Sequence, residues 1–268
     1  MAQALGFRFC GVGRAGAAFL HQTEVDQIAH RAILRAASRV KQQETPMASF
    51  VTLTAADGHS FQAWTDGPAD ATKGLVVIQE IFGVNQHMRN MCAKFAAQGY
   101  AVVAPALFDR AERNVELGYT ADDVARGRTL RGQVPDDGVM LDVAASAAAL
   151  DGKILGIVGY CWGGTVAWWG ATRTKSFKAA VGWYGGGIAA TRTETPASAV
   201  QLHFGEMDSG IPLTDVDLIK AAQPGVEIFV YAGAQHGFGC DERGSFSPAD
   251  AALAQERTLA FFAEHLVG

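Results

Sequence analysis

The sequence predicts an α/β fold in which a mostly parallel central sheet carries helices on both faces. Two observations support this expectation. Short apolar runs typical of buried strands alternate along the chain with segments of helical periodicity, as in parallel sheets that are covered on both faces. The side chains best suited to catalysis each follow one of these apolar runs, at the strand ends where open parallel sheets bind their ligands.

The predicted sheet begins with a β-hairpin. Residues 49–54 and 60–65 are predicted strands, and Asp57-Gly58 between them is a dipeptide typical of tight hairpin turns. The later strands are predicted at 74–80, 100–107, 153–160, 178–186, 199–206 and 226–233.

Helical segments separate the later strands. The first of them, 86–99, is expected to end at Gly99, because glycine readily adopts the left-handed conformation that follows a helix C-terminus. The other helices are predicted at 121–131, 137–150, 163–173, 213–222 and 248–266. The chain has 268 residues, 49% of them hydrophobic, and shows no internal repeat. We therefore expect one α/β domain over 47–268.

The first 46 residues differ from the rest of the chain. They hold apolar residues at roughly helical spacing with arginines between them, as in targeting peptides, but Glu24 and Asp26 argue against that interpretation because such peptides avoid acidic residues. A regular strand pattern begins directly after Met47. We therefore expect Met47 to be the true start, and residues 1–46 to be an N-terminal extension that is disordered or not translated. A natural peptide spanning the Pro46–Met47 bond would contradict this hypothesis.

Composition and charge exclude several classes of protein. The net charge of −5 gives no basic surface for nucleic acid, and no apolar run is long enough to span a membrane. The cysteines lie far apart and form no CxxC pair, which argues against a metal site or a disulfide framework. We expect a cytoplasmic monomer or small homo-oligomer that acts on a small molecule.

Cys161 lies in the segment Gly159-Tyr160-Cys161-Trp162-Gly163, directly after a predicted strand. This segment matches the G-x-S-x-G nucleophile turn, with cysteine in place of serine. Glycines are needed there because the nucleophile occupies a strained strand-to-helix turn. The N-terminus of the helix that follows favours the thiolate form of the cysteine. The alternative is a buried structural thiol on a glycine-rich turn.

Asp208 and His236 follow two later predicted strands. The chain order Cys161, Asp208, His236 is the order of nucleophile, acid and histidine in the α/β-hydrolase fold. In such a triad the histidine takes the proton of the nucleophile, and the acid orients the histidine. Glu206 is the competing candidate for the acid.

Glu80 follows the predicted strand 74–80 at the mouth of the sheet. The loop after this early strand supplies one donor of the oxyanion hole in such folds, which is here the backbone N–H of Ile81. The second donor is expected to be the backbone N–H of Trp162, the residue after the nucleophile. For Glu80 alone, a solvated loop residue is the competing interpretation.

Four segments, "QEIFGVN", "GYCWGG", "GEMDSGIP" and "AQHGF", together resemble the dienelactone hydrolase (carboxymethylenebutenolidase) family of α/β-hydrolases. The resemblance extends from about Met47 to the C-terminus. It implies hydrolysis of dienelactone to maleylacetate, a step of aromatic compound degradation, with no metal and no cofactor. It also implies that Cys161 is the nucleophile, His236 the base and Asp208 the residue that orients it. In this family the residue matched by Glu80 contacts the resting thiol.

The sequence departs from the family where the substrate carboxylate is bound. An arginine that follows the catalytic histidine by four positions in well-known members is Cys240 here, and a thiol cannot replace its paired hydrogen bonds. Arg243 is the expected substitute. Arg126 and Arg110 are the candidates for a second arginine, and Tyr184 is expected to line the pocket.

The predicted activity is that of a carboxylic ester hydrolase that opens a lactone or cleaves a small ester through a thioester. Two alternatives remain at this stage. One is a broad short-chain carboxylesterase, which would be indifferent to a substrate carboxylate. The other is a non-catalytic thiol-sensing protein of the same fold.

Overall fold

The structure, a computed structural model, describes residues 48–268, so the predicted extension 1–46 lies outside the described residues. An eight-stranded sheet has the order β1-β2-β4-β3-β5-β6-β7-β8. Its strands are β1 Ser49–Thr54, β2 Ser60–Asp66, β3 Lys73–Ile78, β4 Ala101–Pro105, β5 Ile154–Tyr160, β6 Ala179–Trp183, β7 Ala199–Gly205 and β8 Glu227–Tyr231. The pairs β1–β2 and β2–β4 are antiparallel and the others parallel, which confirms the predicted mostly parallel sheet.

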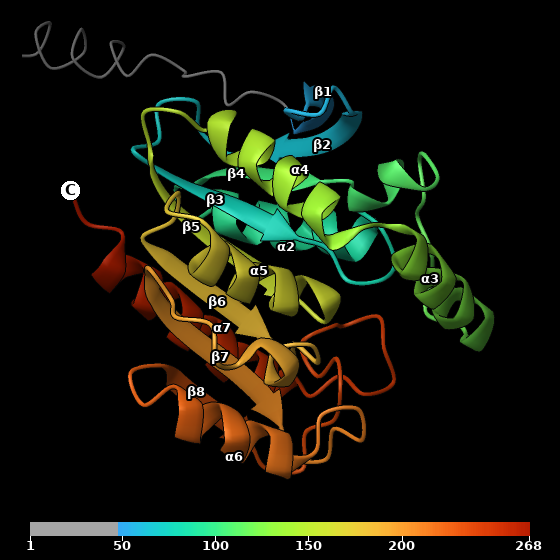
Figure 1. The fold of residues 1–268 in the computed structure, drawn as a ribbon, viewed down its shortest axis with the longest axis vertical. Coiled ribbons are helices and arrows are strands. Elements are labelled where there is room, and N and C mark those ends of the chain that lie inside the picture. The colour runs from blue at the N-terminus through green and yellow to red at the C-terminus, as the bar shows by residue number, and fades with distance from the viewer. Residues whose placement is uncertain (1–47) are drawn as a thin grey trace, which may run out of the picture. The chain divides into compact units, whose positions relative to one another are not determined.

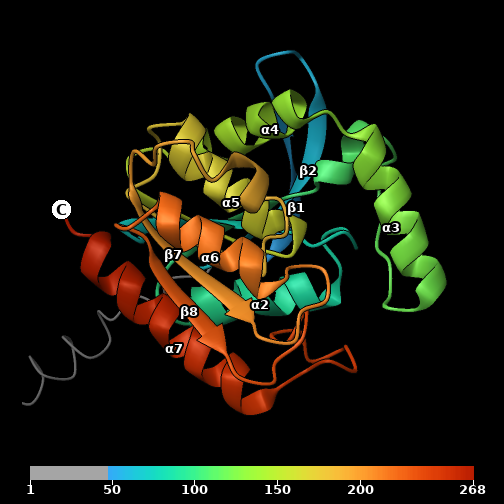
Figure 2. The same cartoon turned by 60° about the horizontal axis from the view of Figure 1, so that its bottom comes forward.

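Helices cover both faces of this sheet. They are α2 Gln86–Ala96, α3 Ala121–Gln133, α4 Asp136–Ala148, α5 Trp162–Arg173, α6 Leu213–Ala222 and α7 Pro248–His265, with short 3-10 turns at Leu107–Arg110 and Ala189–Thr191. Figures 1 and 2 show α4, α5 and α6 on one face and α2 and α7 on the other. No helix among residues 48–268 has the length and apolar character needed to cross a membrane.

The central strands are apolar throughout because both of their faces are covered. In β3, Leu75, Val76, Val77 and Ile78 are all fully buried, as expected for parallel strands between two helix layers. Ile78 pairs with Gly159 of β5 in the parallel register. This register brings the loop after β3 beside the turn after β5, so that the segments carrying Glu80 and Cys161 meet at one end of the sheet.

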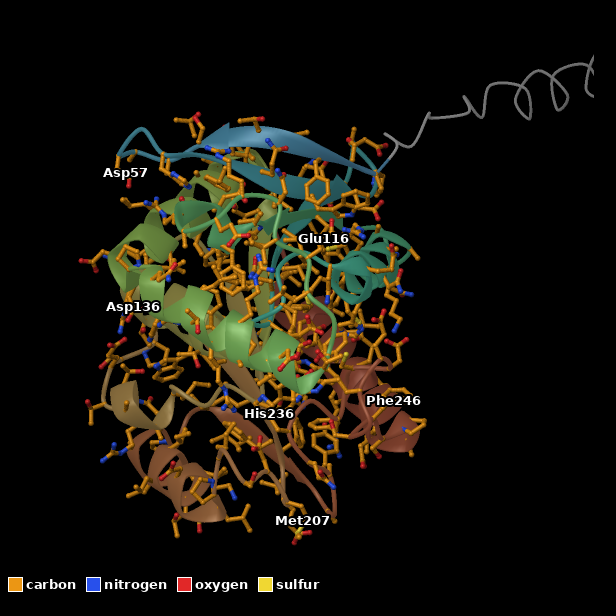
Figure 3. All side chains as sticks on the ribbon, turned by 90° about the vertical axis from the view of Figure 1, so that its right-hand side faces the viewer. Asp57, Glu116, Asp136, Met207, His236 and Phe246 are labelled. Atoms are coloured by element: carbon orange, nitrogen blue, oxygen red, sulfur yellow. The ribbon has the colours of Figure 1, made fainter. Side chains whose placement is uncertain are left out.

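Helix α3 lies beyond the carboxyl ends of the strands, and Figure 3 shows it crossing the molecule beside His236. It begins with a capping box in which Thr120 and Asp123 bond each other's backbone N–H groups. Gly127 permits its close approach to the loop after β3, because a Cβ atom at this position would lie only 2.0 Å from the carbonyl oxygen of Ile81. The helix therefore covers the edge where the predicted catalytic loops end.

Candidate active site

Cys161 occupies a strained turn between β5 and α5. Its backbone has φ 55° and ψ −120°, a conformation that costs a residue with a side chain about 1–3 kcal/mol. A Cβ atom at Gly159 would lie 1.9 Å from the carbonyl oxygen of Gly163, and one at Gly163 would lie 2.5 Å from that of Gln79. Both flanking glycines are thus required by the close backbone contacts of this turn.

The structure brings Cys161, His236 and Asp208 together from the loops after β5, β8 and β7. His236 Nε2 lies 3.1 Å from Cys161 Sγ, and its Nδ1 lies 2.7 Å from Asp208 Oδ2. Asp208 is buried, and the backbone N–H of Gly210 donates to its other oxygen at 2.9 Å. The carboxylate therefore holds the imidazole with Nε2 directed at the sulfur, as a nucleophile–base pair requires. Glu206, the competing acid, instead accepts from the backbone N–H of Gly233.

The pKa of His236 reflects this arrangement. Burial lowers it, but the charge of Cys161 and the hydrogen bond to Asp208 outweigh burial and raise the pKa of His236 to about 10. The thiolate is the nucleophilic form of cysteine, and a histidine in contact with the sulfur is a usual means of producing it.

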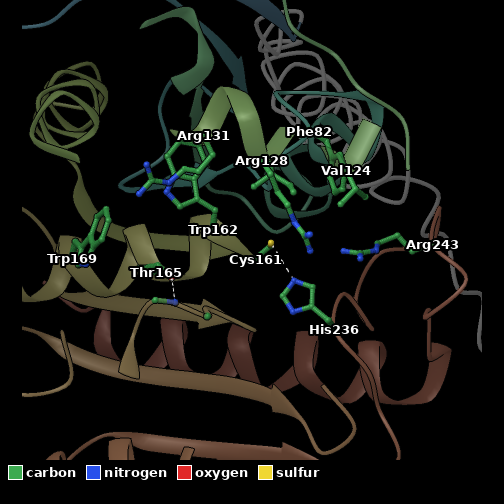
Figure 4. Close-up of a pocket in the computed structure, with 13 residues that line it drawn as sticks. Phe82, Val124, Arg128, Arg131, Cys161, Trp162, Thr165, Trp169, His236 and Arg243 are labelled. Carbon is green, nitrogen blue, oxygen red and sulfur yellow. Dashed lines mark hydrogen bonds between the residues drawn. The ribbon is translucent and has the colours of Figure 1, made fainter. Parts of the chain in front are cut away.

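A cavity of about 380 Å³ opens over the sulfur of Cys161. Figure 4 shows its labelled side chains around Cys161 and His236, with the guanidinium groups of Arg128 and Arg243 directed into the space beside them. The lining residues are Ile81, Phe82, Val124, Arg128, Arg131, Cys161, Trp162, Thr165, Trp169, Gly186, Gly187, His236 and Arg243. The two residues predicted to donate backbone N–H groups to an oxyanion, Ile81 and Trp162, thus border the same space as the nucleophile.

The sequence profile of the dienelactone hydrolase family matches residues 61–266. The chain belongs to the dienelactone hydrolase family. A relative in Synechocystis, named "Putative carboxymethylenebutenolidase", is 33% identical over 212 residues, which cover 72% of this chain and 86% of the relative. A relative of the same name in Azospirillum brasilense is 33% identical over 234 residues and covers 81% of this chain and 98% of its own length.

Solved structures agree with the family assignment. A "Putative Dienelactone Hydrolase" from Klebsiella pneumoniae superposes with a TM-score of 0.68 at 30% identity, over 81% of this chain and 99% of its own. An esterase from Pyrococcus furiosus, at 16% identity and a TM-score of 0.62 over 85% of this chain and 95% of its own, shares the fold. The predicted α/β-hydrolase fold is confirmed, and the protein is a hydrolase of the dienelactone hydrolase family.

Glu80 is fully buried beside the triad, but its contacts differ from those that the family resemblance implied. Its Oε1 lies 3.6 Å from Nη1 of Arg243, and its Oε2 accepts a hydrogen bond from the Tyr119 hydroxyl at 3.5 Å. Cys161 Sγ is hydrogen bonded to His236 instead. In this structure the thiol of Cys161 therefore contacts His236, and Glu80 is paired with Arg243.

The predicted carboxylate-binding residues are placed differently from one another. Arg243 lines the cavity as expected. Arg126 does not, because its guanidinium is directed to Glu112 on the surface. Arg110 is held by Asp57 and Asp142 away from the cavity. These two arginines have structural partners that account for their positions.

Tyr184 contacts the triad without lining the cavity. It is fully buried, and its ring packs edge-on against the imidazole of His236 at 5.2 Å between centroids. Burial raises the pKa of its hydroxyl well above the usual value. Tyr184 therefore packs against the loop that carries His236 and does not line the cavity.

Arg128 and Arg131 are cavity residues that the sequence reasoning missed. Together with Val124 they occupy one face of α3, at the spacing of one and two helical turns. Arg131 stacks over the Trp162 ring at 4.7 Å and pairs with Asp136. Arg128 is exposed, and no acidic side chain among residues 48–268 lies within ion-pair distance of it. The spacing of Arg128 and Arg131 from Val124, which places all three on one face of the helix, was the sequence signal that could have identified them.

Proposed function

We propose that this protein hydrolyses a lactone or small carboxylic ester through Cys161, His236 and Asp208, with dienelactone as the first candidate substrate. One observation carries the proposal: His236 lies 3.1 Å from Cys161 Sγ and 2.7 Å from Asp208, at the floor of a cavity bordered by Arg128 and Arg243. Nucleophile, base and orienting acid stand in the order and contact that acyl transfer needs.

The first half of the reaction forms a thioester. The Cys161 thiolate attacks the carbonyl carbon of the ester or lactone, and negative charge develops on the carbonyl oxygen. The backbone N–H groups of Ile81 and Trp162 are the donors for this oxyanion, and each such donor contributes about 10²–10³ in rate. The carbon–oxygen bond then breaks, and the leaving oxygen takes the proton held on Nε2 of His236.

The second half releases the acid. Neutral His236 accepts a proton from water, and the hydroxide formed attacks the thioester. The carbon–sulfur bond breaks, the product leaves as a carboxylic acid, and the thiolate–imidazolium pair is restored. For dienelactone the leaving group is an enol, which becomes the keto group of maleylacetate.

The two arginines at the cavity wall favour a substrate that carries a carboxylate. Arg128 and Arg243 both border the cavity, and a guanidinium binds a carboxylate through paired hydrogen bonds. A substrate carboxylate that draws Arg243 away from Glu80 leaves that buried carboxylate without its cation. Binding of a substrate carboxylate and the Glu80–Arg243 pair therefore compete for one guanidinium.

The test is the loss of ultraviolet absorbance of cis- and trans-dienelactone with purified protein, beside the Cys161→Ala variant. Rapid loss that requires Cys161 is the expected result. A neutral p-nitrophenyl ester is run in parallel. Cleavage of the neutral ester alone, dependent on Cys161, would retain the chemistry and overturn the dienelactone assignment.

A short-chain carboxylesterase is the second candidate, and the aromatic part of the cavity favours it. Phe82, Trp162 and Trp169 border the space beside Cys161 and suit an apolar acyl chain. This reading predicts equal kcat/KM for neutral and carboxylated esters of the same length. The non-catalytic alternative predicts no turnover of either ester, and a Cys161 that resists iodoacetamide both with and without substrate.

A further inference from the structure

We infer that Glu80, His87 and Cys240 form a binding site for a borderline divalent cation such as Zn²⁺, distinct from the catalytic triad. The three residues come from the loop after β3, the first turn of α2 and the loop before α7. One ligand atom from each, a carboxylate oxygen, a ring nitrogen and a sulfur, lies within 4.8 Å of the others. Within residues 48–268, this cluster is the one group of such donors with that spacing.

The distances suit a small tetrahedral ion. Zinc bonds of 2.0–2.3 Å to oxygen, nitrogen and sulfur place the ligand atoms about 3.3–3.8 Å apart. The three donors therefore need to approach one another by about 1.5 Å or less, which side-chain rotation can supply. Three protein ligands leave one position for water, as in zinc sites that are not purely structural.

His87 provides the independent indication of a ligand. The side chain is 1% exposed, and its Nε2 has no hydrogen-bond partner among the described residues. Its other ring nitrogen, Nδ1, lies 2.9 Å from Asp241 Oδ1. Metal-binding histidines generally donate their second N–H to a carboxylate in this manner, which fixes the ring and leaves the other nitrogen for the metal.

Glu80 adds a second unsatisfied atom. Its Oε1 is buried without a hydrogen-bond partner in the described part of the chain, and the nearest cation is Arg243 at 3.6 Å. Leaving a charged oxygen unbonded in a protein interior is costly. A divalent cation held by the carboxylate and the Cys240 thiolate would balance two negative charges and compete with Arg243 for Glu80.

The donor set determines the class of ion. A thiolate and an imidazole favour Zn²⁺ and its spectroscopic substitute Co²⁺, whereas Mg²⁺ and Ca²⁺ prefer oxygen ligands alone. Cys240 is fully buried and free of any disulfide. Binding breaks its S–H bond, forms a metal–sulfur bond and releases one proton to solvent. No oxidant or reductant is required.

The experiment is a Co²⁺ titration of the full chain after treatment with a chelator. We expect one equivalent to produce the thiolate-to-cobalt charge-transfer band and the intense visible bands of four-coordinate Co²⁺. Zn²⁺ is expected to displace the cobalt, and excess Mg²⁺ is not. Absence of these bands in the wild-type protein would overturn the proposal.

Variants identify the ligands. Cys240→Ser and His87→Gln should lose the charge-transfer band or weaken Co²⁺ binding at least 100-fold, whereas Cys161→Ser and Cys92→Ser should retain both. Cys92 is the matched control because it is equally buried and lies outside the cluster. A band lost in Cys161→Ser and kept in Cys240→Ser would assign the metal to the catalytic thiol and contradict the inference.

A variant of Asp241, the residue that contacts His87, guards against misfolding. Asp241 is 47% exposed at its side chain, so Asp241→Asn is expected to leave the thermal melt unchanged. The loss of its contact to His87 should weaken Co²⁺ binding about 10–100-fold. Unchanged affinity in this folded variant would show that His87 is not the nitrogen ligand.

Discussion

Arg243 lies 3.6 Å from the carboxylate of Glu80, and the same guanidinium borders the cavity above Cys161. Glu80 is 1% exposed at its side chain and Arg243 21%. The glutamate therefore depends on the arginine for charge compensation, while the arginine also faces the substrate space. A substitution at either residue is therefore expected to change both the free energy of unfolding and the catalytic rate.

The Glu80–Arg243 pair predicts a recovery in stability. Arg243→Ala should lower the free energy of unfolding by about 1–3 kcal/mol, because it leaves a buried carboxylate uncompensated. Adding Glu80→Gln should restore most of this loss, since the amide carries no charge. Urea unfolding of the two single variants and the double variant measures the coupling. Additive losses would mean that the two groups do not interact.

Arg128 and Arg126 provide a matched pair on α3. Arg128→Ala should lower kcat/KM for a carboxylated ester about 10–100-fold, because one charge-assisted contact contributes about 1.5–3 kcal/mol. A neutral ester of equal length should be cleaved at the wild-type rate. Arg126→Ala removes the same charge from the same helix outside the cavity and should change neither substrate. Equal effects of both variants would reduce the role of Arg128 to general attraction of anions.

The positive φ of Cys161 predicts that this residue lowers the stability of the fold while it is required for activity. Cys161→Gly and Cys161→Ala should both abolish turnover, but the glycine variant should be the more stable by about 1 kcal/mol. The reason is that glycine adopts φ 55° without the strain that any Cβ atom introduces. Thermal and urea unfolding of the two inactive variants decides this. A less stable glycine variant would show that the turn is relaxed in the native protein.

The pKa of His236, raised to about 10 mainly by Cys161 and Asp208 against the effect of burial, predicts its titration. Because this pKa lies above the unfolded value of about 6.5, the protonated ring stabilises the fold fully below pH 6.5. That contribution is lost as pH rises through about 10. In Cys161→Ala the main cause of the increase is absent, so the pKa should fall markedly. Nuclear magnetic resonance of labelled histidine measures the pKa of His236 in the wild-type protein and in the variant. An unchanged titration in the variant would show that Cys161 is not the cause of the raised pKa.

Gly127 predicts a loss of both stability and activity. In Gly127→Ala the new Cβ atom would meet the Ile81 carbonyl oxygen at 2.0 Å, which pushes α3 off the loop that carries one oxyanion donor. We expect kcat to fall at least tenfold and unfolding to become easier by more than 1 kcal/mol. Gly132→Ala, on the same helix with no atom within 4 Å of the new methyl group, should be stabilised by about 0.5–1 kcal/mol. Similar behaviour of both variants would remove the proposed role of this contact.

The sequence was sufficient for the order of elements and for the residues that meet at the triad. Local patterns identify strands such as 153–160 and 226–233, and the parallel arrangement places the residues after them at one edge. Cys161, Asp208 and His236 meet there for that reason. Their catalytic roles stay predictions until turnover is measured.

The choice of the α3 arginine that faces the cavity, and the contacts of Glu80, could not be predicted in the same way. Arg126 and Arg128 are two residues apart, and the choice between them depends on how α3 is rotated against the loop at Ile81. That rotation is set by tertiary packing at Gly127, which local periodicity does not encode. The approach of His87 and Cys240 to Glu80 likewise joins segments far apart in the chain.

Helix α3 contributes its cavity-lining residues from a part of the chain that is separate from the loops of the proposed triad. Val124, Arg128 and Arg131 come from consecutive turns of this one short helix, whereas the triad arises from loops after β5, β7 and β8. Exchanging the cavity-facing residues of this helix while keeping Gly127 is therefore expected to alter the wall proposed to bind the substrate and to leave the triad in place. Divergence among relatives, and laboratory evolution of new ester preferences, is expected to concentrate in this segment.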